Sequence, residues 1–340
     1  MSVVVDSRQR RRVAATERPP LLELRDLVVE YGTDRGAVTA VNGVSLGIRP
    51  GEIVGLAGES GCGKSTIANA ILQVLRPPGR IAGGEIVFKG RNLVGLPNSE
   101  LRRIRWRHIA IVFQSAMSSL NPVTRIEAQF VDMFRAHQKI SKRFATMKAA
   151  ELLEVVGIDR DRLRAYPHEL SGGMRQRVVI AMAMALGPEL LLLDEPTTAL
   201  DVIVQREILQ QLEELQREMG FAVLFITHDL SLLVEFSDRI AIMYSGDIVE
   251  EADAAELFAR PAHPYTAGLM ASFPPLSGEL TTMTGIPGNP PDLHDPPNGC
   301  RFHPRCPVAR RQPCHIEMPV LRAVASPKHQ VACHFPLEAP

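Results

Sequence analysis

Short apolar runs bounded by turn or polar residues recur along the chain and predict buried parallel strands. The runs lie at residues 53–57, 190–193 and 221–227. Each is too short for a helix, and its continuous apolar character is typical of a strand covered on both faces. Ile208, Leu212 and Leu215 recur at three- and four-residue spacing, with Met219 next, and predict one face of a helix. The pattern indicates an α/β fold.

Other segments follow a different periodicity and indicate additional parts. Residues 22–30 and 44–48 alternate apolar and polar positions, which predicts antiparallel strands. A second hairpin is predicted over 240–250. Residues 125–170 are mostly helical in pattern. We therefore expect an α/β core with an antiparallel β subdomain and a helical subdomain at about 120–180.

Composition limits the protein class and suggests the domain boundaries. At roughly 150 residues per domain, 340 residues allow about two domains. Apolar residues make up 45% of the chain, which excludes full disorder. Prolines become frequent after about residue 260, where a loop-rich segment is expected. The expected division is a disordered tail at 1–19, a main domain at 20–260 and a C-terminal domain at 261–340.

Charge and cysteine content exclude several functions. Lysine plus arginine and aspartate plus glutamate both number 38, so no global field favours nucleic acid. The pattern of five cysteines favours a reducing compartment rather than a secreted disulfide scaffold. The chain has no run of 18 apolar residues and no apolar stretch behind its N-terminal arginines. We expect a cytosolic protein or a peripheral membrane subunit.

A phosphate-binding loop follows the first predicted strand. Residues 58–66 read Gly-Glu-Ser-Gly-Cys-Gly-Lys-Ser-Thr and match G-x-x-x-x-G-K-[ST] between a strand and a helix. Glycines let successive N–H groups point inward, and the helix N-terminus adds partial positive charge. Lys64 would reach the β- and γ-phosphates of ATP, and Ser65 would bind Mg²⁺. The predicted ATP-binding residues here are Gly58, Ser60, Gly61, Cys62, Gly63, Lys64, Ser65 and Thr66.

Two carboxylates end the second apolar run. The segment Leu-Leu-Leu-Leu-Asp-Glu-Pro places Asp194 and Glu195 directly after a buried strand. Asp194 would hold Mg²⁺, directly or through water. Glu195 would orient a water for attack on the γ-phosphate. A solvated acidic pair is the alternative, but the phosphate loop favours a nucleotide site.

With these motifs the chain resembles the ATP-binding cassette (ABC) family over about residues 20–260. Residues 170–177, Leu-Ser-Gly-Gly-Met-Arg-Gln-Arg, are similar to the family's signature. The resemblance implies that this segment binds the γ-phosphate of ATP held by an opposing subunit. The residues assigned to this role are Ser171, Gly172, Gly173 and Gln176.

Further positions match the family in order and spacing. Gln114 resembles the Q-loop glutamine, which senses Mg²⁺ and couples the site to a membrane partner. Asp201 resembles the D-loop aspartate, and His228 the switch histidine at the γ-phosphate. Tyr31 resembles the aromatic residue that stacks on adenine. The resemblance implies an ATPase in which Glu195 and His228 are catalytic.

The C-terminal segment narrows the resemblance to the ATPase subunits of oligopeptide, dipeptide and nickel importers. Residues 263–266, His-Pro-Tyr-Thr, and 299–307, Gly-Cys-Arg-Phe-His-Pro-Arg-Cys-Pro, carry it. It implies a D-type subunit that pairs with a homologous F-type ABC subunit. The other implied partners are two membrane permeases and, indirectly, a solute-binding protein. The implied location is the cytoplasmic face of the cell membrane.

Four cysteines near the C-terminus have the spacing C-x5-C-x7-C-x18-C. Four thiolates in a loop-rich segment suit tetrahedral sulfur ligation, by zinc or by an iron–sulfur cluster. A segment without metal is the third possibility. The family resemblance implies a [4Fe–4S] cluster. Its expected ligands are Cys300, Cys306, Cys314 and Cys333.

Two other functions compete with peptide import. One is a soluble ABC ATPase in DNA repair or translation, although the chain has neither a heptad run before the signature nor a second cassette. The other is a regulatory cassette that senses iron or redox state. Within the importer hypothesis, peptides lead over nickel and oligosaccharides as substrate.

Overall fold

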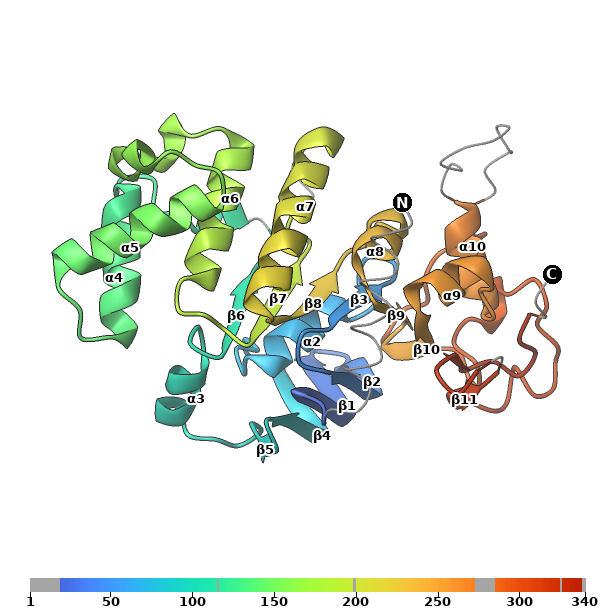
Figure 1. Ribbon diagram of the computed structural model, residues 1–340. Helices are drawn as coiled ribbons and strands as arrows, with labels where there is room; N and C mark the ends of the chain where they lie inside the picture. Colours follow the sequence, from blue (N-terminus) through green and yellow to red (C-terminus); the bar gives the residue numbers. More distant parts are fainter. Residues whose placement is uncertain (1–18, 115, 198–199, 273–284, 325, 338–340) are drawn as a thin grey trace. The chain divides into compact units, whose positions relative to one another are not determined.

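The computed structural model describes residues 19–114, 116–197, 200–272, 285–324 and 326–337 (Figure 1). The expected disordered tail lies almost wholly outside these residues. The chain divides into two units. Described parts of Met1–Arg49, Ile53–Val94 and Phe225–Pro340 form the first, and Pro50–Glu52 with Gly95–Leu224 form the second.

An antiparallel sheet of four strands, in the order β2-β1-β4-β5, begins the first unit. The two predicted strands at 22–30 and 44–48 are parts of longer ones, because their antiparallel pairing continues to a tight turn where Thr33 faces Gly36. Leu27, Val29 and Val41 are fully buried. The strands are β1 (Leu22–Thr33), β2 (Gly36–Ile48), β4 (Gly79–Phe88) and β5 (Arg91–Asn92).

The first unit also contains five neighbouring strands of the second sheet, which has eight strands in all, and their order is β11-β12-β10-β9-β3. Strand β3 runs parallel to β9, and β9 forms the predicted hairpin with β10. Val54, Leu56 and Ile242 are fully buried, as their continuous apolar runs require. The strands are β3 (Ile53–Ala57), β9 (Arg239–Tyr244), β10 (Asp247–Asp253), β11 (Arg322–Ala323) and β12 (Gln330–Val331).

Short helices connect these strands. The helix after β3 begins at Lys64, three residues earlier than the apolar pattern predicts, because the glycine-rich loop leads directly into it. The helices of the first unit are α2 (Lys64–Ile71), α8 (Leu230–Phe236), α9 (Ala254–Ala259) and α10 (Pro264–Ala271), with a 3₁₀ turn at His303–Arg305.

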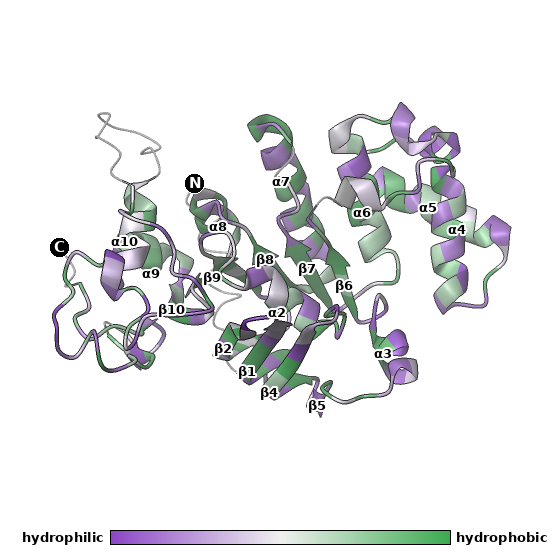
Figure 2. Ribbon diagram, turned by 180° about the vertical axis from the view of Figure 1, so that it is seen from behind, coloured by the Kyte–Doolittle hydropathy of each residue, from purple (hydrophilic) through white to green (hydrophobic). Residues whose placement is uncertain are grey.

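The second unit combines two parallel strands with helices. Strands β6 (Ile109–Val112) and β7 (Leu190–Asp194) are apolar, and they are green in Figure 2. Strand β8 (Ala222–Ile226) crosses the division between the units. The helices are α3 (Asn98–Ile104), α4 (Ile126–His137), α5 (Lys142–Val155), α6 (Gly172–Met184) and α7 (Val202–Met219), with 3₁₀ turns at Ala116–Ser119, Arg160–Arg164 and Pro167–Glu169.

The helical pattern predicted over 125–170 is confirmed in α4 and α5. These helices pack through fully buried side chains, among them Phe130 and Phe134, whose ring centroids are 6.5 Å apart. Helix α7 buries Ile208, Leu212 and Leu215, as their spacing predicts, but Met219, the last residue of the predicted face, is 49% exposed at the end of the helix. In the described part of the chain, no helix is both long enough and apolar enough to span a membrane.

Within the first unit, a buried carboxylate joins the C-terminal segment to strand β10. Strand β12 pairs with β10, where Glu250 faces Val331 and is itself fully buried. The carboxylate of Glu250 accepts the N–H groups of Ala262 (2.6 Å) and His263 (3.0 Å), and His329 Nε2 lies 2.7 Å away. These partners offset the cost of burying the charge.

The ion pair between His329 and Glu250 predicts a pH-dependent stability. The hydrogen bond to Glu250 raises the pKa of His329 above its ordinary value of 6.5, and Glu256 adds to the effect. The pair therefore contributes fully below that ordinary value, and its contribution is lost as the pH rises through the raised pKa. Removing one partner of a buried pair costs about 3–5 kcal/mol.

We expect His329→Gln to lower the thermal unfolding midpoint more at pH 5.5 than at pH 8.5. The exposed His294 of the same segment serves as the control, and His294→Gln should change neither value. An equal loss at both pH values would contradict the assignment of the charge to His329.

Candidate functional site

The phosphate loop connects β3 to α2 and depends on two glycines. Gly63 precedes α2 with a φ of 110°, which only glycine adopts readily. A Cβ atom at Gly63 would lie 2.2 Å from the carbonyl oxygen of Ala40, and one at Gly58 would lie 2.1 Å from that of Met243. The loop is therefore packed against backbone that cannot yield to a side chain.

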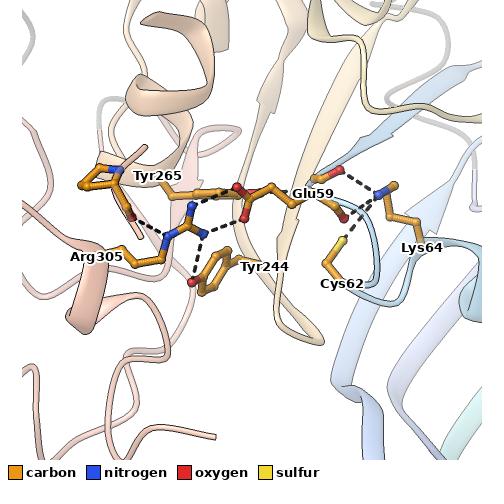
Figure 3. Close-up of polar contacts among 8 residues, drawn as sticks. Glu59, Cys62, Lys64, Tyr244, Tyr265 and Arg305 are labelled. Atoms are coloured by element: carbon orange, nitrogen blue, oxygen red, sulfur yellow. Dashed lines mark hydrogen bonds and ion pairs between the residues drawn. The ribbon is translucent and has the colours of Figure 1, made fainter. Parts of the chain in front are cut away.

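Lys64 is folded back onto this loop. Its side chain is buried, and Nζ donates to the carbonyl oxygens of Gly58 (2.7 Å) and Glu59 (2.9 Å), with Cys62 Sγ at 3.6 Å (Figure 3). The ammonium group and the first N–H groups of α2 concentrate positive charge at one end of the loop. Such a donor set suits the phosphates of a nucleotide.

The remaining loop residues differ in exposure. Ser60 and Gly61 are exposed, whereas Ser65 and Thr66 are half-buried in the first turn of α2. Cys62 is 5% exposed, and burial raises the pKa of its thiol against the opposing charge of Lys64. A protonated, enclosed thiol indicates a packing role for this residue.

Tyr31 and His228 also belong to the first unit. Tyr31 lies within β1, not in a turn, and its hydroxyl is 3.5 Å from Thr66 Oγ1. The exposed His228 follows β8. The preceding Thr227 donates its N–H to Leu56 O at 3.3 Å, which aligns this strand end with that of β3. The structure thus places Tyr31 next to α2. It also places Thr227, the residue before His228, next to β3.

The second unit holds the acidic pair and Gln114. Asp194 ends β7 and is 4% exposed. Glu195 follows with a φ of 46°, in the left-handed region that costs non-glycine residues energy. Gln114 Nε2 donates to Glu195 Oε2 at 3.4 Å. The structure therefore joins the predicted Q-loop glutamine to the predicted catalytic carboxylate.

The signature segment begins α6. Ser171 caps this helix, and its Oγ accepts the N–H of Met174 at 3.3 Å. Gly173 approaches α7 so closely that a Cβ would lie 2.7 Å from a Val204 methyl carbon. Gln176 lies one turn further along and is 2% exposed, and no described residue accepts from its amide nitrogen. Its side chain faces the interior, unlike the exposed Ser171.

Asp201 of the predicted D-loop is the N-cap residue of α7. Its carboxylate accepts the N–H of Val204 at 3.0 Å, and the residue is exposed. Ala199, the first residue of that motif, lies outside the described residues.

The expectation of an iron–sulfur cluster, or of zinc as its alternative, is not supported. Across the described ranges, no group of three or more His, Cys, Asp or Glu side chains could hold a metal ion. The four cysteines do line one cavity, but its volume is about 10 Å³, which is the space of about one water. Burial raises the pKa of Cys300 and of Cys333 to about 11. The described residues therefore give no support to the metal-binding appendage that was expected in the C-terminal segment.

The sequence did not predict the residues that support the phosphate loop through Glu59. Arg305 forms an ion pair with Glu59 at 2.7 Å, and the hydroxyl of Tyr265 accepts the N–H of Glu59 at 2.9 Å. Glu59 occupies a variable position of the loop motif. Its partners lie more than 200 positions along the chain, so no local spacing could identify them.

The cassette fold and the phosphate loop define the class of protein, an ABC-type ATPase. The pattern of the ABC transporter family matches residues 41–198, and that of the oligopeptide/dipeptide transporter C-terminal region matches 249–314. Among solved structures, the ATP-binding cassette MJ0796 bound to ADP and Pi is similar with a TM-score of 0.62 and 30% identity. The match covers 68% of this chain and 98% of that one.

Curated relatives place the chain more narrowly. The probable peptide ABC transporter ATP-binding protein y4tR of Sinorhizobium fredii is 45% identical, over 92% of this chain and 94% of its own length. The oligopeptide transport ATP-binding protein OppD of Bacillus subtilis is 46% identical, over 89% and 86%. The dipeptide transport ATP-binding protein DppD of Escherichia coli is 41% identical, over 94% and 97%. The chain belongs to the family of ATP-binding proteins of peptide ABC transporters.

The packing of the phosphate loop predicts a strict requirement at Gly58. Because a Cβ would meet the backbone of Met243, Gly58→Ala must displace the loop and should raise the Kd for ATP at least tenfold, measured by titration calorimetry. Gly47→Ala is the control, because its Cβ would meet only Pro20 carbons at 3.8 Å or more. Unchanged ATP affinity in Gly58→Ala would contradict a rigid loop.

The position of Glu195 predicts separate effects on binding and hydrolysis. General-base catalysis contributes typically about 10²–10⁴-fold, so Glu195→Gln should lower the ATPase rate at least 100-fold. The Kd for ATP should stay within threefold, because the amide has nearly the same shape. Glu189→Gln, just before β7, is the control and should keep its activity. A similar loss of ATPase activity in both variants would contradict the catalytic role of Glu195.

Proposed function

We propose that this chain is the ATP-hydrolysing subunit that powers peptide import through a membrane permease. The observation that carries the proposal is the joint match of residues 41–198 to the ABC transporter family and of residues 249–314 to the oligopeptide/dipeptide transporter C-terminal region. The identity extends over about nine-tenths of the chain. The phosphate loop and the Asp194–Glu195 pair are best suited to ATP hydrolysis, which is the activity of the family.

Residues of the first unit would hold the nucleotide. Loop N–H groups and Lys64 would bind the phosphates, and Tyr31 would stack on adenine. The bound Mg²⁺ neutralises phosphate charge, and Ser65 would provide one of its ligands. His228, exposed after β8, would contact the γ-phosphate.

Residues of the second unit would complete the chemistry. Asp194 would hold Mg²⁺ with Gln114, and Glu195 would accept a proton from the attacking water. Ser171 and the glycine N–H groups at the start of α6 would bind the γ-phosphate held by an opposing cassette. The resemblance assigns Gln176 to the same role, and its side chain is 2% exposed in this structure.

The expected assembly is a heterodimer with a second, F-type ABC subunit on two permease subunits. A solute-binding protein would deliver the substrate to the permeases. In this assembly the chain lies at the cytoplasmic face of the membrane as a peripheral subunit. The DNA-repair and translation hypotheses have no support among the peptide-transport relatives named above.

Reconstitution tests this proposal. The chain, its co-purifying ATPase and the permeases are placed in liposomes with the solute-binding protein. We expect ATP-dependent uptake of labelled peptides and at least a several-fold stimulation of ATPase activity by peptide. Nickel and an oligosaccharide are tested in parallel, and uptake of either in place of peptide would change the substrate class.

The matched control is the same assembly containing Glu195→Gln, which should bind the permeases but not drive uptake. Purification of the tagged chain without permeases, or with ribosomes or DNA, would contradict the importer function.

A further inference from the structure

One arginine of the C-terminal segment contacts the phosphate loop directly. Arg305 ends the 3₁₀ turn at His303–Arg305 and lies 246 positions from Glu59. Its Nη1 donates to Glu59 Oε2 at 2.7 Å, and its Nη2 donates to Glu59 Oε1 at 3.0 Å (Figure 3). Two parallel bonds of this kind fix orientation as well as distance, which one ammonium group cannot do.

The guanidinium group of Arg305 makes further polar contacts besides those to Glu59. Nε donates to Pro287 O at 2.9 Å, and Nη1 is 3.4 Å from the hydroxyl of Tyr244. The guanidinium carbon lies 5.8 Å from the centre of the Tyr244 ring. The side chain is 5% exposed, so little solvent screens its charge. The guanidinium is therefore a rigid part of the C-terminal segment.

Glu59 is held at each of its polar groups. The carboxylate binds Arg305, the N–H donates to Tyr265, and the carbonyl oxygen accepts from Lys64 Nζ. The carbonyl also accepts the N–H of Cys62 at 3.3 Å. One residue of the loop thus connects the phosphate-binding lysine to the C-terminal segment.

An aromatic cluster supports these contacts. The ring of Tyr244 lies 4.6 Å from that of Tyr265 and 5.2 Å from that of Phe302, between centroids. Tyr265 and Phe302 are 5.3 Å apart. Because packed rings allow little movement, the hydroxyl of Tyr265 and the guanidinium of Arg305 present fixed partners to the loop.

We propose that Arg305 is a positioning residue, through which the C-terminal segment holds the phosphate loop in its ATP-binding conformation. The inference rests on the proposed ATP-binding function of that loop. Arg305 does not bind the nucleotide. It fixes Glu59, so that the loop N–H groups remain convergent before the phosphates arrive. Loss of the contact also leaves the Glu59 carboxylate uncompensated beside an anionic ligand.

This arrangement links ATP affinity to the state of the C-terminal segment. Any change that moves Arg305 away from Glu59 weakens ATP binding, and by linkage bound ATP stabilises the Arg305 contact to the same extent. The segment acts on nucleotide binding and leaves the reacting atoms untouched.

The test measures the Kd for ATP and the steady-state constants in the full-length chain. Arg305→Ala should raise the Kd and the KM at least tenfold. Arg305→Lys should raise them less, because lysine keeps the positive charge but cannot make the two parallel hydrogen bonds to the Glu59 carboxylate. The kcat at saturating ATP should stay within about threefold. Glu59→Gln keeps the shape of the side chain and tests the other end of the pair, even if Arg305→Ala fails to fold.

A double-mutant cycle separates this role from general destabilisation. Arg305→Ala combined with Glu59→Gln should raise the Kd no further than Arg305→Ala alone, because both changes remove one contact. Arg322→Ala is the matched control. Arg322 belongs to the same segment and donates to the carbonyl oxygens of Cys333 (3.0 Å) and His334 (3.2 Å).

Three results would overturn the proposal. These are an ATP Kd within twofold of wild type in both Arg305 variants, full additivity in the cycle, or an equal rise in Arg322→Ala. Absence of ATP binding by the wild-type chain is a different result, because it would refute the proposed function itself.

Discussion

The buried carboxylate of Glu250 is the constraint on which the C-terminal segment depends. A charge at this position is tolerated only because two backbone N–H groups and His329 surround it. Two of these partners, Ala262 and His263, follow helix α9, and the third, His329, directly precedes β12, the strand that pairs with β10. One of them, His263, in turn accepts the N–H of Tyr265 at its Nδ1 atom, at 3.0 Å. Burial lowers the pKa of His263 to about 4, so its ring remains a neutral acceptor. A continuous series of contacts thus leads from Glu250 to the tyrosine that holds the phosphate loop.

The phosphate loop therefore has two sources of order. Its own glycines and the start of α2 determine the curvature of the backbone, as in any loop of this type. The aromatic cluster and Arg305 hold it from the side opposite Lys64. A cassette without a C-terminal segment must rely on the first source alone. This chain has the second source as well, so we infer that its C-terminal segment contributes to nucleotide binding without supplying a ligand to the nucleotide.

The predicted site residues are divided between the two units. The residues proposed to bind phosphates and adenine, namely the loop and Tyr31, belong to the first unit, and so does His228, for which the resemblance implies a catalytic role. The residues proposed to hold Mg²⁺ with the loop, to activate water or to contact an opposing cassette belong to the second, where Gln114 meets Glu195. The left-handed backbone of Glu195 indicates that this unit maintains a strained residue at the point where proton transfer is expected. Helix α6 carries the other specialised groups of this unit, with Ser171 at its exposed end and Gln176 inside.

The amino-acid sequence by itself determined the cassette. Strand, loop and helix follow one another within 20 residues around Lys64, so local periodicity and the glycine pattern suffice to predict them. The same holds for the end of β7 and for the start of α6. Only the tertiary structure decided the role of the C-terminal segment. Cysteine spacing suggested a metal cluster, but the depth of burial and the size of a cavity depend on packing that spacing does not encode. The pairing of β12 with β10, and of Arg305 with Glu59, joins residues 80 to 250 positions apart. Such contacts arise from the shape of the folded chain, and no local pattern specifies them.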